Sequence, residues 1–366
     1  MGEVANIPQL RFPEFSNEWE ESKVGKVFKV SAGGDIKTEN VSQIKTDGFP
    51  YPIYANAEKA KGLYGYSNLY KSEANVVTVA GRGVNIGIAH VRLEPFYPIV
   101  RLLVLNPIKD ADVKFWENQL NQLNLFVEST GVPQLTAPQI SSYKVKYPSK
   151  PEQQKIAAFL TAVDNKIEQL SKKQELLGEY KKGLMQQIFS QAIRFKADDG
   201  SDFPDWEEKK LGDVSDCLDN RRQPLNGAER NQMKGDIPYY GANGIVDYVN
   251  DYIFDEELVL LAEDGGNFND FSSKPIAQKI SGKAWVNNHA HILKAKNIIA
   301  TDFLFYSLVH KDIRRYIVGG SRAKLNKSDL LSIKTILPPL EEQAKIASFL
   351  SSIDNKIEQV GKQLVE

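Results

Sequence analysis

The chain has 366 residues, of which 42% are hydrophobic and 25% charged, a composition typical of a folded globular protein with about two domains. Lys and Arg total 46 and Asp and Glu total 47, so the net charge of −1 favours no class of partner. The single cysteine, Cys217, excludes an internal disulfide and a cysteine-based zinc site, and suits a reducing cytoplasm. No apolar stretch approaches the roughly 20 residues of a membrane-spanning helix, and no secretory signal is recognisable at the start.

The first globular part, about residues 20–147, is predicted to be mixed β structure with some helix. Short apolar runs at 76–80 and 100–105 predict buried strands, and 113–127 predicts a helix. The loop Gly81–Asn85 follows the first strand. Its glycines allow close approach of a ligand, while Arg and Asn can form paired hydrogen bonds with guanine and adenine. A plain hairpin turn is the alternative for this loop.

A long helix is predicted from Ser149 onward. Ser149 and Glu152 have the spacing of a capping box, and Pro151 fits the first turn. Apolar residues then recur every seven positions, as in a helix that pairs with another helix. These seam residues are Ile156, Val163, Leu170, Leu177 and Leu184. The alternative is an amphipathic helix that covers its own domain.

The segment 198–204 has the composition of a linker, and the second globular part, about 205–336, follows it. Here 258–262 predicts a buried strand and 302–316 a helix, and the glycine- and asparagine-containing loop 263–269 follows the strand. Between Lys311 and Lys334 there are seven cations and two acids. This run predicts a phosphate-binding stripe, with a solvated charged face as the alternative.

An internal repeat relates the two halves. Residues 152–169 and 342–359 agree at 13 of 18 positions, with an offset of 190. Further upstream, Trp19 and its following acids return at Trp206, and Tyr54-Ala55-Asn56 returns in part around Asn243. The second helix repeats the seam at Ile346, Ile353 and Val360. We therefore predict an α+β chain with two similar mixed domains and two long helices that pair as an antiparallel coiled coil.

The sequence contains no recognisable pattern of a catalytic or cofactor-binding site. No glycine-rich loop ends in Lys-Ser or Lys-Thr, so no nucleotide phosphate site is predicted. The Asn-Pro-Pro-aromatic pattern of adenine methyltransferases does not occur either. His289 and His291 are two apart, as on alternate faces of one strand, and no metal site is predicted from them. The sequence therefore predicts no catalytic centre.

Taken together, the two globular units, each followed by a copy of the EQxKIAxFLxxxDNKIEQ helix, resemble the DNA-specificity subunit of type I restriction-modification enzymes. The resemblance covers essentially the whole chain. It implies two target-recognition domains, each contacting half of a bipartite DNA sequence, held apart by two conserved helices. The segments implied are 1–147 (first recognition domain), 148–196 (first helix), 197–337 (second recognition domain) and 338–366 (second helix). The sequence holds no second copy of 175–194, so we expect a shortened pairing.

The resemblance also implies a non-catalytic, cytoplasmic subunit that binds double-stranded DNA. Two modification subunits would bring S-adenosylmethionine, and restriction subunits would bring ATP and Mg²⁺ for translocation and cleavage. No cofactor is expected in this chain. The competing hypotheses are a protein-interaction scaffold without DNA specificity and a self-contained enzyme. We predict DNA contacts from residues of the loops and basic segments: Asn56, Lys59, Lys61, Arg82, Asn85, Arg221, Arg222, Asn243, Asn267, Asn269, Lys274, Arg314, Arg315, Arg322 and Lys324.

Overall fold

The computed structural model describes residues 8–56, 59–108, 110–123, 125, 133–320 and 323–365. The chain divides into two compact units, Met1–Ile167 and Glu168–Glu366, and the boundary falls inside helix α4 (Lys150–Phe189). Within the described ranges, the helices are too short or too polar to cross a membrane.

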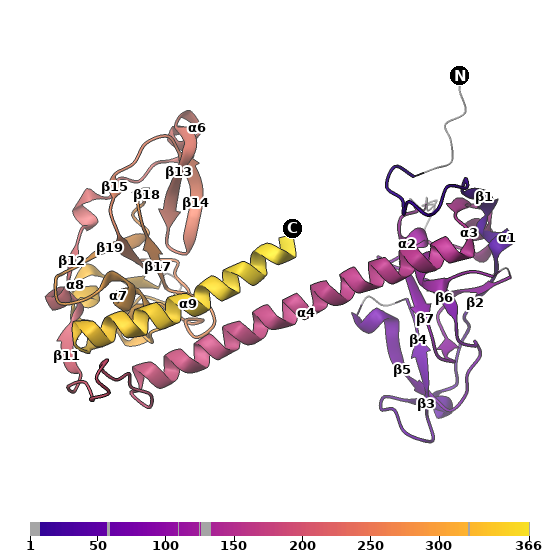
Figure 1. Ribbon diagram of the computed structural model, residues 1–366, viewed down its shortest axis with the longest axis horizontal. Coiled ribbons are helices and arrows are strands. Elements are labelled where there is room, and N and C mark those ends of the chain that lie inside the picture. The colour runs from indigo at the N-terminus through magenta and orange to yellow at the C-terminus, as the bar shows by residue number, and fades with distance from the viewer. Residues whose placement is uncertain are drawn as a thin grey trace. The chain divides into compact units, whose positions relative to one another are not determined.

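The first unit is built on a four-stranded antiparallel sheet with the order β2-β9-β6-β7 (Figure 1). A second sheet has the order β3-β5-β4-β8, in which β4 and β8 are parallel. Strands β1 and β10 pair with Glu20 opposite Tyr147, so the two ends of the recognition part lie next to each other. The elements are β1 (Glu20–Lys23), α1 (Val24–Val27), β2 (Phe28–Ala32), η1 (Thr38–Asn40), β3 (Val41–Ser42), β4 (Tyr51–Tyr54), η2 (Lys59–Gly62), β5 (Leu63–Ser67), β6 (Val76–Val79), β7 (Ala89–Arg92), β8 (Tyr97–Pro98), β9 (Leu103–Pro107), α2 (Val113–Asn121), α3 (Ala137–Ser142) and β10 (Lys144–Tyr147).

The apolar runs form the strands of this core, with corrected boundaries. Every residue of β6 is buried, as predicted for 76–80. The strand predicted at 100–105 begins only at Leu103, because Val100 and Arg101 adopt positive φ values of 51° and 60° and turn the chain. The helix predicted over 113–127 ends at Asn121, and residues 124 and 126–132 lie outside the described ranges.

The second unit repeats this layout. Its sheets have the orders β12-β19-β16-β17 and β14-β13-β18-β15, and β11 pairs with β22 as β1 pairs with β10. The elements are β11 (Glu207–Lys210), α5 (Leu211–Val214), β12 (Ser215–Cys217), η3 (Asp219–Arg221), α6 (Gly227–Gln232), β13 (Lys234–Gly241), β14 (Gly244–Val249), β15 (Phe254–Asp255), β16 (Leu258–Ala262), β17 (Ala277–Ile280), β18 (Lys283–Val286), β19 (Ala290–Ala295), α7 (Thr301–Leu308), η4 (Arg314–Tyr316), β20 (Ile317–Val318), β21 (Lys324–Leu325), α8 (Lys327–Ser332), β22 (Lys334–Leu337) and α9 (Leu340–Val365).

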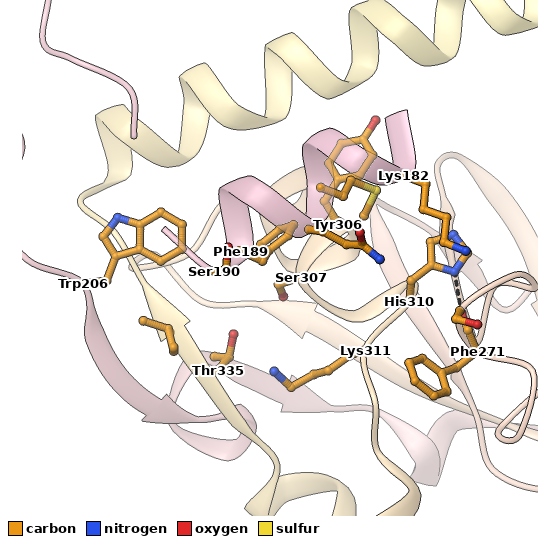
Figure 2. A pocket seen from close by; sticks show the side chains of 14 residues that line it. Lys182, Phe189, Ser190, Trp206, Phe271, Tyr306, Ser307, His310, Lys311 and Thr335 are labelled. Carbon is orange, nitrogen blue, oxygen red and sulfur yellow. Dashed lines mark hydrogen bonds between the residues drawn. The ribbon is translucent and has the colours of Figure 1, made fainter. Parts of the chain in front are cut away.

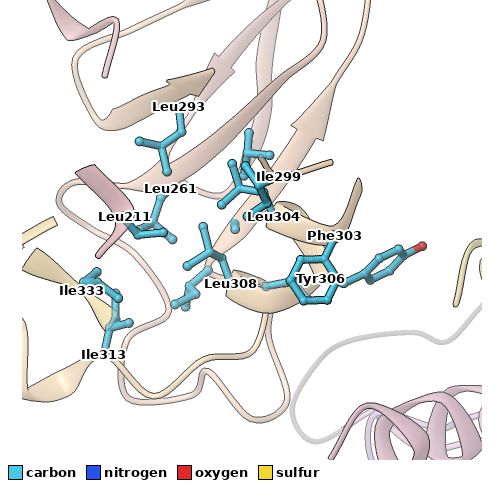
Figure 3. Packing of buried hydrophobic residues seen from close by; sticks show 14 of the residues in the cluster. Leu211, Leu261, Leu293, Ile299, Phe303, Leu304, Tyr306, Leu308, Ile313 and Ile333 are labelled. Carbon is cyan, nitrogen blue, oxygen red and sulfur yellow. The ribbon is translucent and has the colours of Figure 1, made fainter. Parts of the chain in front are cut away.

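The core of the second unit lies between the β16 sheet and α7 (Figure 3). Leu261 and Leu293 from the sheet meet Leu304 and Leu308 from α7 there. The helix predicted over 302–316 was too long, since α7 ends at Leu308 and the chain then turns. The carbonyl oxygen of Val309 accepts a hydrogen bond from the amide of Ile276, and a separate turn, η4, follows at Arg314–Tyr316.

A buried glutamate fixes the start of each long helix to its own unit. Glu152 accepts two hydrogen bonds from Arg11, both at 2.7 Å, and one from the Trp19 indole. Its carboxylate is thus held by side chains from the start of the chain, and the predicted capping box with Ser149 stays a prediction. The repeat preserves the arrangement. Glu342 accepts from Arg194 at 2.8 and 2.9 Å and from the Trp206 indole at 3.0 Å.

The glutamine that follows each glutamate makes a second attachment. Gln153 accepts from the amide of Asp112, which caps α2, and donates to the Pro148 carbonyl. Gln343 likewise accepts from the amide of Ala300, the N-cap of α7, and donates to the Pro338 carbonyl. The Glu-Gln pair of the repeated motif thus links helix and module in both halves.

Helix α9 packs antiparallel along the part of α4 that belongs to the second unit (Figure 1). Lys181 pairs with Asp354 at 2.6 Å, and Gly361 lies against Gln174. Residues nearer the start of α4 therefore contact residues nearer the end of α9. This confirms the predicted antiparallel coiled coil for that stretch.

The seam residues differ in burial between the two helices. In α9, Ile346, Ile353 and Val360 are all buried, as is Leu170 in α4. Leu177 and Leu184 are partly buried. Ile156 packs against the core of the first unit, and Val163 remains 39% exposed. The same motif is therefore covered by helix α4 in its second copy and is largely bare in its first.

The pairing of α4 with α9 predicts that an isoleucine-to-alanine change lowers the free energy of unfolding by different amounts at two positions. Ile353→Ala removes a side chain that is 3% exposed and leaves a cavity, so we expect a loss of about 2 to 4 kcal/mol in the free energy of unfolding of the second unit. Ile167→Ala is the matched control, because Ile167 in α4 is 48% exposed and its loss should cost less than about 1 kcal/mol. Denaturant unfolding followed by circular dichroism measures both. Equal costs would contradict the pairing.

Candidate nucleic-acid interface

The loops after β6 and β16 occupy equivalent places in the two units. Each contains a glycine in the left-handed region, Gly83 with φ 82° and Gly265 with φ 63°, where a side chain would strain the turn. Each loop also bridges to the strand-like segment before the next short helix. Arg82 bridges to Gln134 in the first unit, and Asp264 bridges to Lys324 in the second. The backbone frame is shared, whereas the charges it presents are opposite.

An asparagine braces each of these loops from the neighbouring sheet. Asn56 accepts from the amide of Gly81 at 3.0 Å and donates to the Val100 carbonyl at 2.5 Å. Asn243 donates to the Gly265 carbonyl at 2.8 Å. Both asparagines were predicted to contact DNA. Their amide groups hold the loops, and their predicted DNA contacts stay predictions.

Arg82 is the cation of the first loop. Its terminal nitrogen donates to the Gln134 side chain at a long distance of 3.4 Å, and its buried Nε has no hydrogen-bond partner among the described residues. An unpaired buried donor is costly. Nearby Asn85 lines a hollow of about 130 Å³ together with His90 and Arg92.

Arg92 is the buried cation of that hollow. It donates to the Thr78 hydroxyl at 2.9 Å and to the Lys61 carbonyl at 2.7 Å. Its guanidinium also lies 3.6 Å from the centre of the Tyr54 ring. Burial lowers the pKa of Arg92, and the Tyr54 hydroxyl opposes this shift. Arg92 therefore connects β7 to the turn at Lys61 as a structural cation.

In the second unit, an ion network lies beneath the loop. Arg222 donates to Glu263 at 2.5 Å, and the second oxygen of Glu263 meets Lys324 at 3.0 Å. Burial opposes ionisation of Glu263, but the hydrogen bonds from Arg222 and Lys324 outweigh it and lower its pKa. Arg222 and Lys324, both predicted DNA contacts, are therefore largely neutralised by the protein itself.

His291 continues this network into the interior. One ring nitrogen lies 2.6 Å from Asp219 and the other 2.8 Å from the carbonyl oxygen of Leu325. Cys217, Asp219 and His291 come within 4.8 Å of one another, close enough to consider a metal ion. Because a carbonyl and a carboxylate only accept hydrogen bonds, both ring nitrogens are donors, which leaves His291 no lone pair for a metal.

A groove of about 560 Å³ opens beside the second loop. It lies between the loop, the β13–β14 hairpin and the segment before β19, and presents Arg230, Asn243, Asp264 and His289. His289 and Asp264 are 2.5 Å apart and partly exposed. These groups offer both donors and acceptors at one surface, as base-edge recognition requires.

Arg230 and His289 were not among the predicted contacts. Arg230 lies on α6 and bonds to Asp247 of β14 at 3.1 Å. Hydrogen bonds from Lys234, the Tyr248 amide and Arg230 lower the pKa of Asp247 to about 2. The contact between this short capped helix and the hairpin that follows it leaves no pattern in the sequence.

The basic segment Lys311–Lys334 is not a row of free cations in its described part. Arg314 pairs with Asp312 at 2.7 Å, and Lys334 pairs with Glu208 at 2.6 Å. Arg315 donates to the Tyr316 hydroxyl. Arg322 lies outside the described residues, and its predicted phosphate contact stays a prediction.

Lys311 enters an apolar pocket of about 380 Å³ between α4, α7 and β22. Figure 2 shows it extending along the pocket towards Thr335, with Trp206 and Phe189 in the walls. Burial and the positive charge of Arg315 lower its pKa. Lys311 thus lines this pocket, and its predicted part in a phosphate-binding stripe stays a prediction.

The remaining predicted contacts are spread over separate loops. Arg221 pairs with Glu256, Lys274 pairs with Asp270, and the Asn267 amide donates to the Pro275 carbonyl. Lys61 and Asn269 are exposed. The side chain of Lys59 is not described. The structure thus brings Asn243, Arg222 and Lys324 together around loop 263–266, and Asn56, Arg82 and Asn85 around loop 81–85.

Comparison with known families gives a match over most of the chain. The model of the type I restriction modification DNA specificity domain matches twice, at residues 16–177 and 204–366. These two matches follow the two halves of the internal repeat.

Relatives agree with this match. A putative type I restriction enzyme specificity subunit of Haemophilus influenzae is 37% identical in the matched part. That part covers 40% of this chain and 37% of the H. influenzae protein. The putative MjaX specificity subunit of Methanocaldococcus jannaschii is 29% identical over 96% of this chain and 91% of its own length. The crystal structure of a type I restriction-modification S subunit from M. genitalium has a TM-score of 0.68 at 17% identity, and covers 99% of this chain and 95% of its own. That structure shows a shared fold.

The brace at Asn56 predicts a local effect on backbone exchange. Asn56→Ala removes the acceptor of the Gly81 amide, so we expect hydrogen exchange at Gly81 to accelerate by roughly tenfold or more. Asn243→Ala, in the other unit, is the control and should leave Gly81 unchanged. Amide exchange measured by nuclear magnetic resonance tests both. Unchanged protection of Gly81 in Asn56→Ala would refute the brace.

Proposed function

Because the chain belongs to the family of type I restriction-modification DNA specificity proteins, we propose that it recognises a DNA target made of two half-sites, one for each unit. The observation that carries this proposal is the duplicated loop frame, with Gly83 and Gly265 at equivalent turns and opposite charges beside them. A shared frame with different side chains suits two modules that bind the same kind of ligand but different base sequences.

The loop chemistry supports different base preferences. An arginine such as Arg82 donates to the O6 and N7 acceptors of guanine, whereas a carboxylate such as Asp264 accepts from the cytosine amino group. His289 beside Asp264 and Arg230 across the groove add donors in the second unit. The near-neutral chain and its internally paired cations favour recognition in the grooves over binding by bulk charge.

The paired helices suit a spacer between the half-sites. Helix α4 has 40 residues and α9 has 26, lengths of about 60 and 39 Å at 1.5 Å per residue. Both exceed one turn of DNA, about 34 Å. We propose that α4 fixes a gap of unread base pairs between the sequences that the two modules contact.

The bare face of α4 supports assembly with other subunits. Phe159, Val163 and Ile167 are between 39% and 56% exposed. At the same positions in α9, Ile353 is buried, and Phe349 and Ile357 are partly buried. Rows of exposed apolar side chains on a helix favour a protein partner. We propose that modification subunits carrying S-adenosylmethionine, and restriction subunits using ATP and Mg²⁺, assemble with this chain on cytoplasmic DNA. This chain supplies specificity and no catalysis.

One experiment tests the function as a whole. The complex of this chain with its modification subunits is incubated with random-sequence DNA, and the retained molecules are sequenced. Two enriched blocks at a constant separation support the proposal. Retention without enriched sequence would contradict it and favour a scaffold without DNA specificity.

The spacer proposal predicts a change in the gap. Insertion of one heptad after Ile167 adds about 10 Å of helix, which is about three base pairs of rise. The insertion point precedes the stretch of α4 paired with α9, so the pairing is preserved. We expect the retained sequences to keep both blocks and to lengthen the gap. An unchanged gap would exclude α4 as the spacer.

Modularity predicts a separate result. Residues 20–147 begin and end on paired strands, with Glu20 opposite Tyr147, so this part can be exchanged for that of a relative with little disturbance. We expect the exchange to replace one enriched block and to preserve the other. Sequencing of methylated adenines in cells that carry the hybrid provides the readout. A change in both blocks would count against independent modules.

A further inference from the structure

His291 is a buried charge beneath the second recognition loop. It is 1% exposed, and its Nε2 donates to the Leu325 carbonyl at 2.8 Å. Its Nδ1 donates to Asp219 at 2.6 Å, and the other oxygen of Asp219 accepts from the Ile292 amide at 3.0 Å. A ring that donates from both nitrogens carries two protons and a positive charge.

Two carboxylates and two further cations lie in the network around this ring. Asp219 also lies 3.3 Å from Arg222, and Glu263 lies 3.6 Å from the His291 ring. Lys324 completes the network through Glu263, and the thiol of Cys217 faces the ring from β12. A neutral ring has only one N–H, so loss of the imidazolium proton would turn a ring lone pair towards either Asp219 or the Leu325 carbonyl, a costly change in a mostly buried site.

The hydrogen-bond chain runs from this ring to the loop. His291 holds the Leu325 carbonyl, and the Leu325 amide donates to the Glu263 carbonyl at 2.7 Å. The Glu263 amide donates to the His289 carbonyl at 2.8 Å. Glu263 is therefore fixed on both sides of its backbone, immediately before Asp264 and Gly265.

We propose that His291, as an imidazolium, is a positioning residue that sets the geometry of loop 263–266 and thereby the base preference of the second module. This inference rests on the proposed function. His291 does not touch the groove, so it acts through Leu325, Glu263 and Asp219.

The first unit holds its loop in a different way. His291 of β19 lies opposite Leu261, and its counterpart Leu103 of β9 lies opposite Val79. Leu103 is apolar and buried, and Gly81 stands where the second unit has Glu263. The first loop is braced by Asn56 instead. Changes at His291 should therefore affect one half-site and spare the other.

The test compares four forms of the assembled complex with modification subunits on random-sequence DNA. His291→Gln removes the charge and retains hydrogen-bonding groups, and His291→Lys restores a charge. His310→Gln, a change in a half-buried histidine that bonds to Phe271, is the matched control beside wild type. Preserved enrichment of the first half-site shows that each complex is folded and active in binding.

We expect His291→Gln to lower the enrichment of the second half-site by about tenfold or more, as for the loss of one or two base contacts, with part of it recovered in His291→Lys. His310→Gln should match wild type. The proposal is overturned if His291→Gln keeps the second half-site, or if His291→Lys loses as much as His291→Gln.

The pH dependence of binding by the wild-type complex provides an independent test. Burial opposes the charge on His291, but hydrogen bonds to Asp219, Cys217 and Leu325 outweigh it and raise its pKa to about 9 from an ordinary 6.5. The contribution of this ring is therefore complete below pH 6.5 and is lost as the pH rises through about 9. We expect second-site enrichment to fall across that range relative to the first site. Parallel behaviour of both sites overturns the role of the charge.

Failure of the proposed function gives a different result. In that case wild type retains no paired sequence blocks at all, and the positioning role is decided on the free protein. Amide signals of residues 263–266 in ¹⁵N-labelled His291→Gln, compared with wild type and His310→Gln, then show whether the loop moves. A displaced loop supports the inference, and unchanged signals overturn it.

Discussion

The rest of the structure depends on the buried attachment of each long helix to its module. Glu152 and Glu342 are almost fully buried and are held by an arginine and a tryptophan, while the next residue, Gln153 or Gln343, bonds to the N-cap of α2 or α7. A buried carboxylate without its arginine would be strongly unfavourable, so the helix cannot begin elsewhere or rotate about its axis. The proposed spacer role of α4 requires an orientation fixed in this way.

The same frame carries two different solutions to loop positioning. In the first unit a neutral amide from Asn56 holds the loop, and an apolar residue, Leu103, fills the space below it. In the second unit charges occupy that space, centred on His291 and Glu263. The sheets are superficially alike, because strand pairing is a property of the backbone. The residues beneath the loops are free to differ, which allows the modules to diverge in the bases they contact without altering the fold.

Sequence reasoning reached the repeat, the fold class and the antiparallel helices, since 13 identities within 18 residues and a seven-residue apolar period can be read directly from the sequence. It misplaced the ends of α2, α7 and β9, where single turns such as that at Val100 and Arg101 decide the boundary. It also missed the ion pair of Glu152, because the partner Arg11 is 141 positions away. Counts of charge along the chain overestimated the number of unpaired cations. Arg222 and Lys324 both pair with Glu263, which is distant from them in the sequence, and Arg314 pairs with the nearby Asp312. Arg230 and His289 lacked any sequence pattern, because the groove forms only when α6, the hairpin and the loop meet.

Met185 and Ile188, near the end of α4, belong to the hydrophobic core of the second unit together with Leu211 and Ile346. A gene interrupted between codons 198 and 204 would therefore produce an N-terminal polypeptide carrying core residues that the C-terminal polypeptide needs in order to fold. The two products would be obliged to associate, since apolar surface on each would otherwise face water. Natural shuffling of the second module between related genes would then succeed most readily when the crossover lies upstream of Met185, so that the final turns of the helix travel with the sheet they complete.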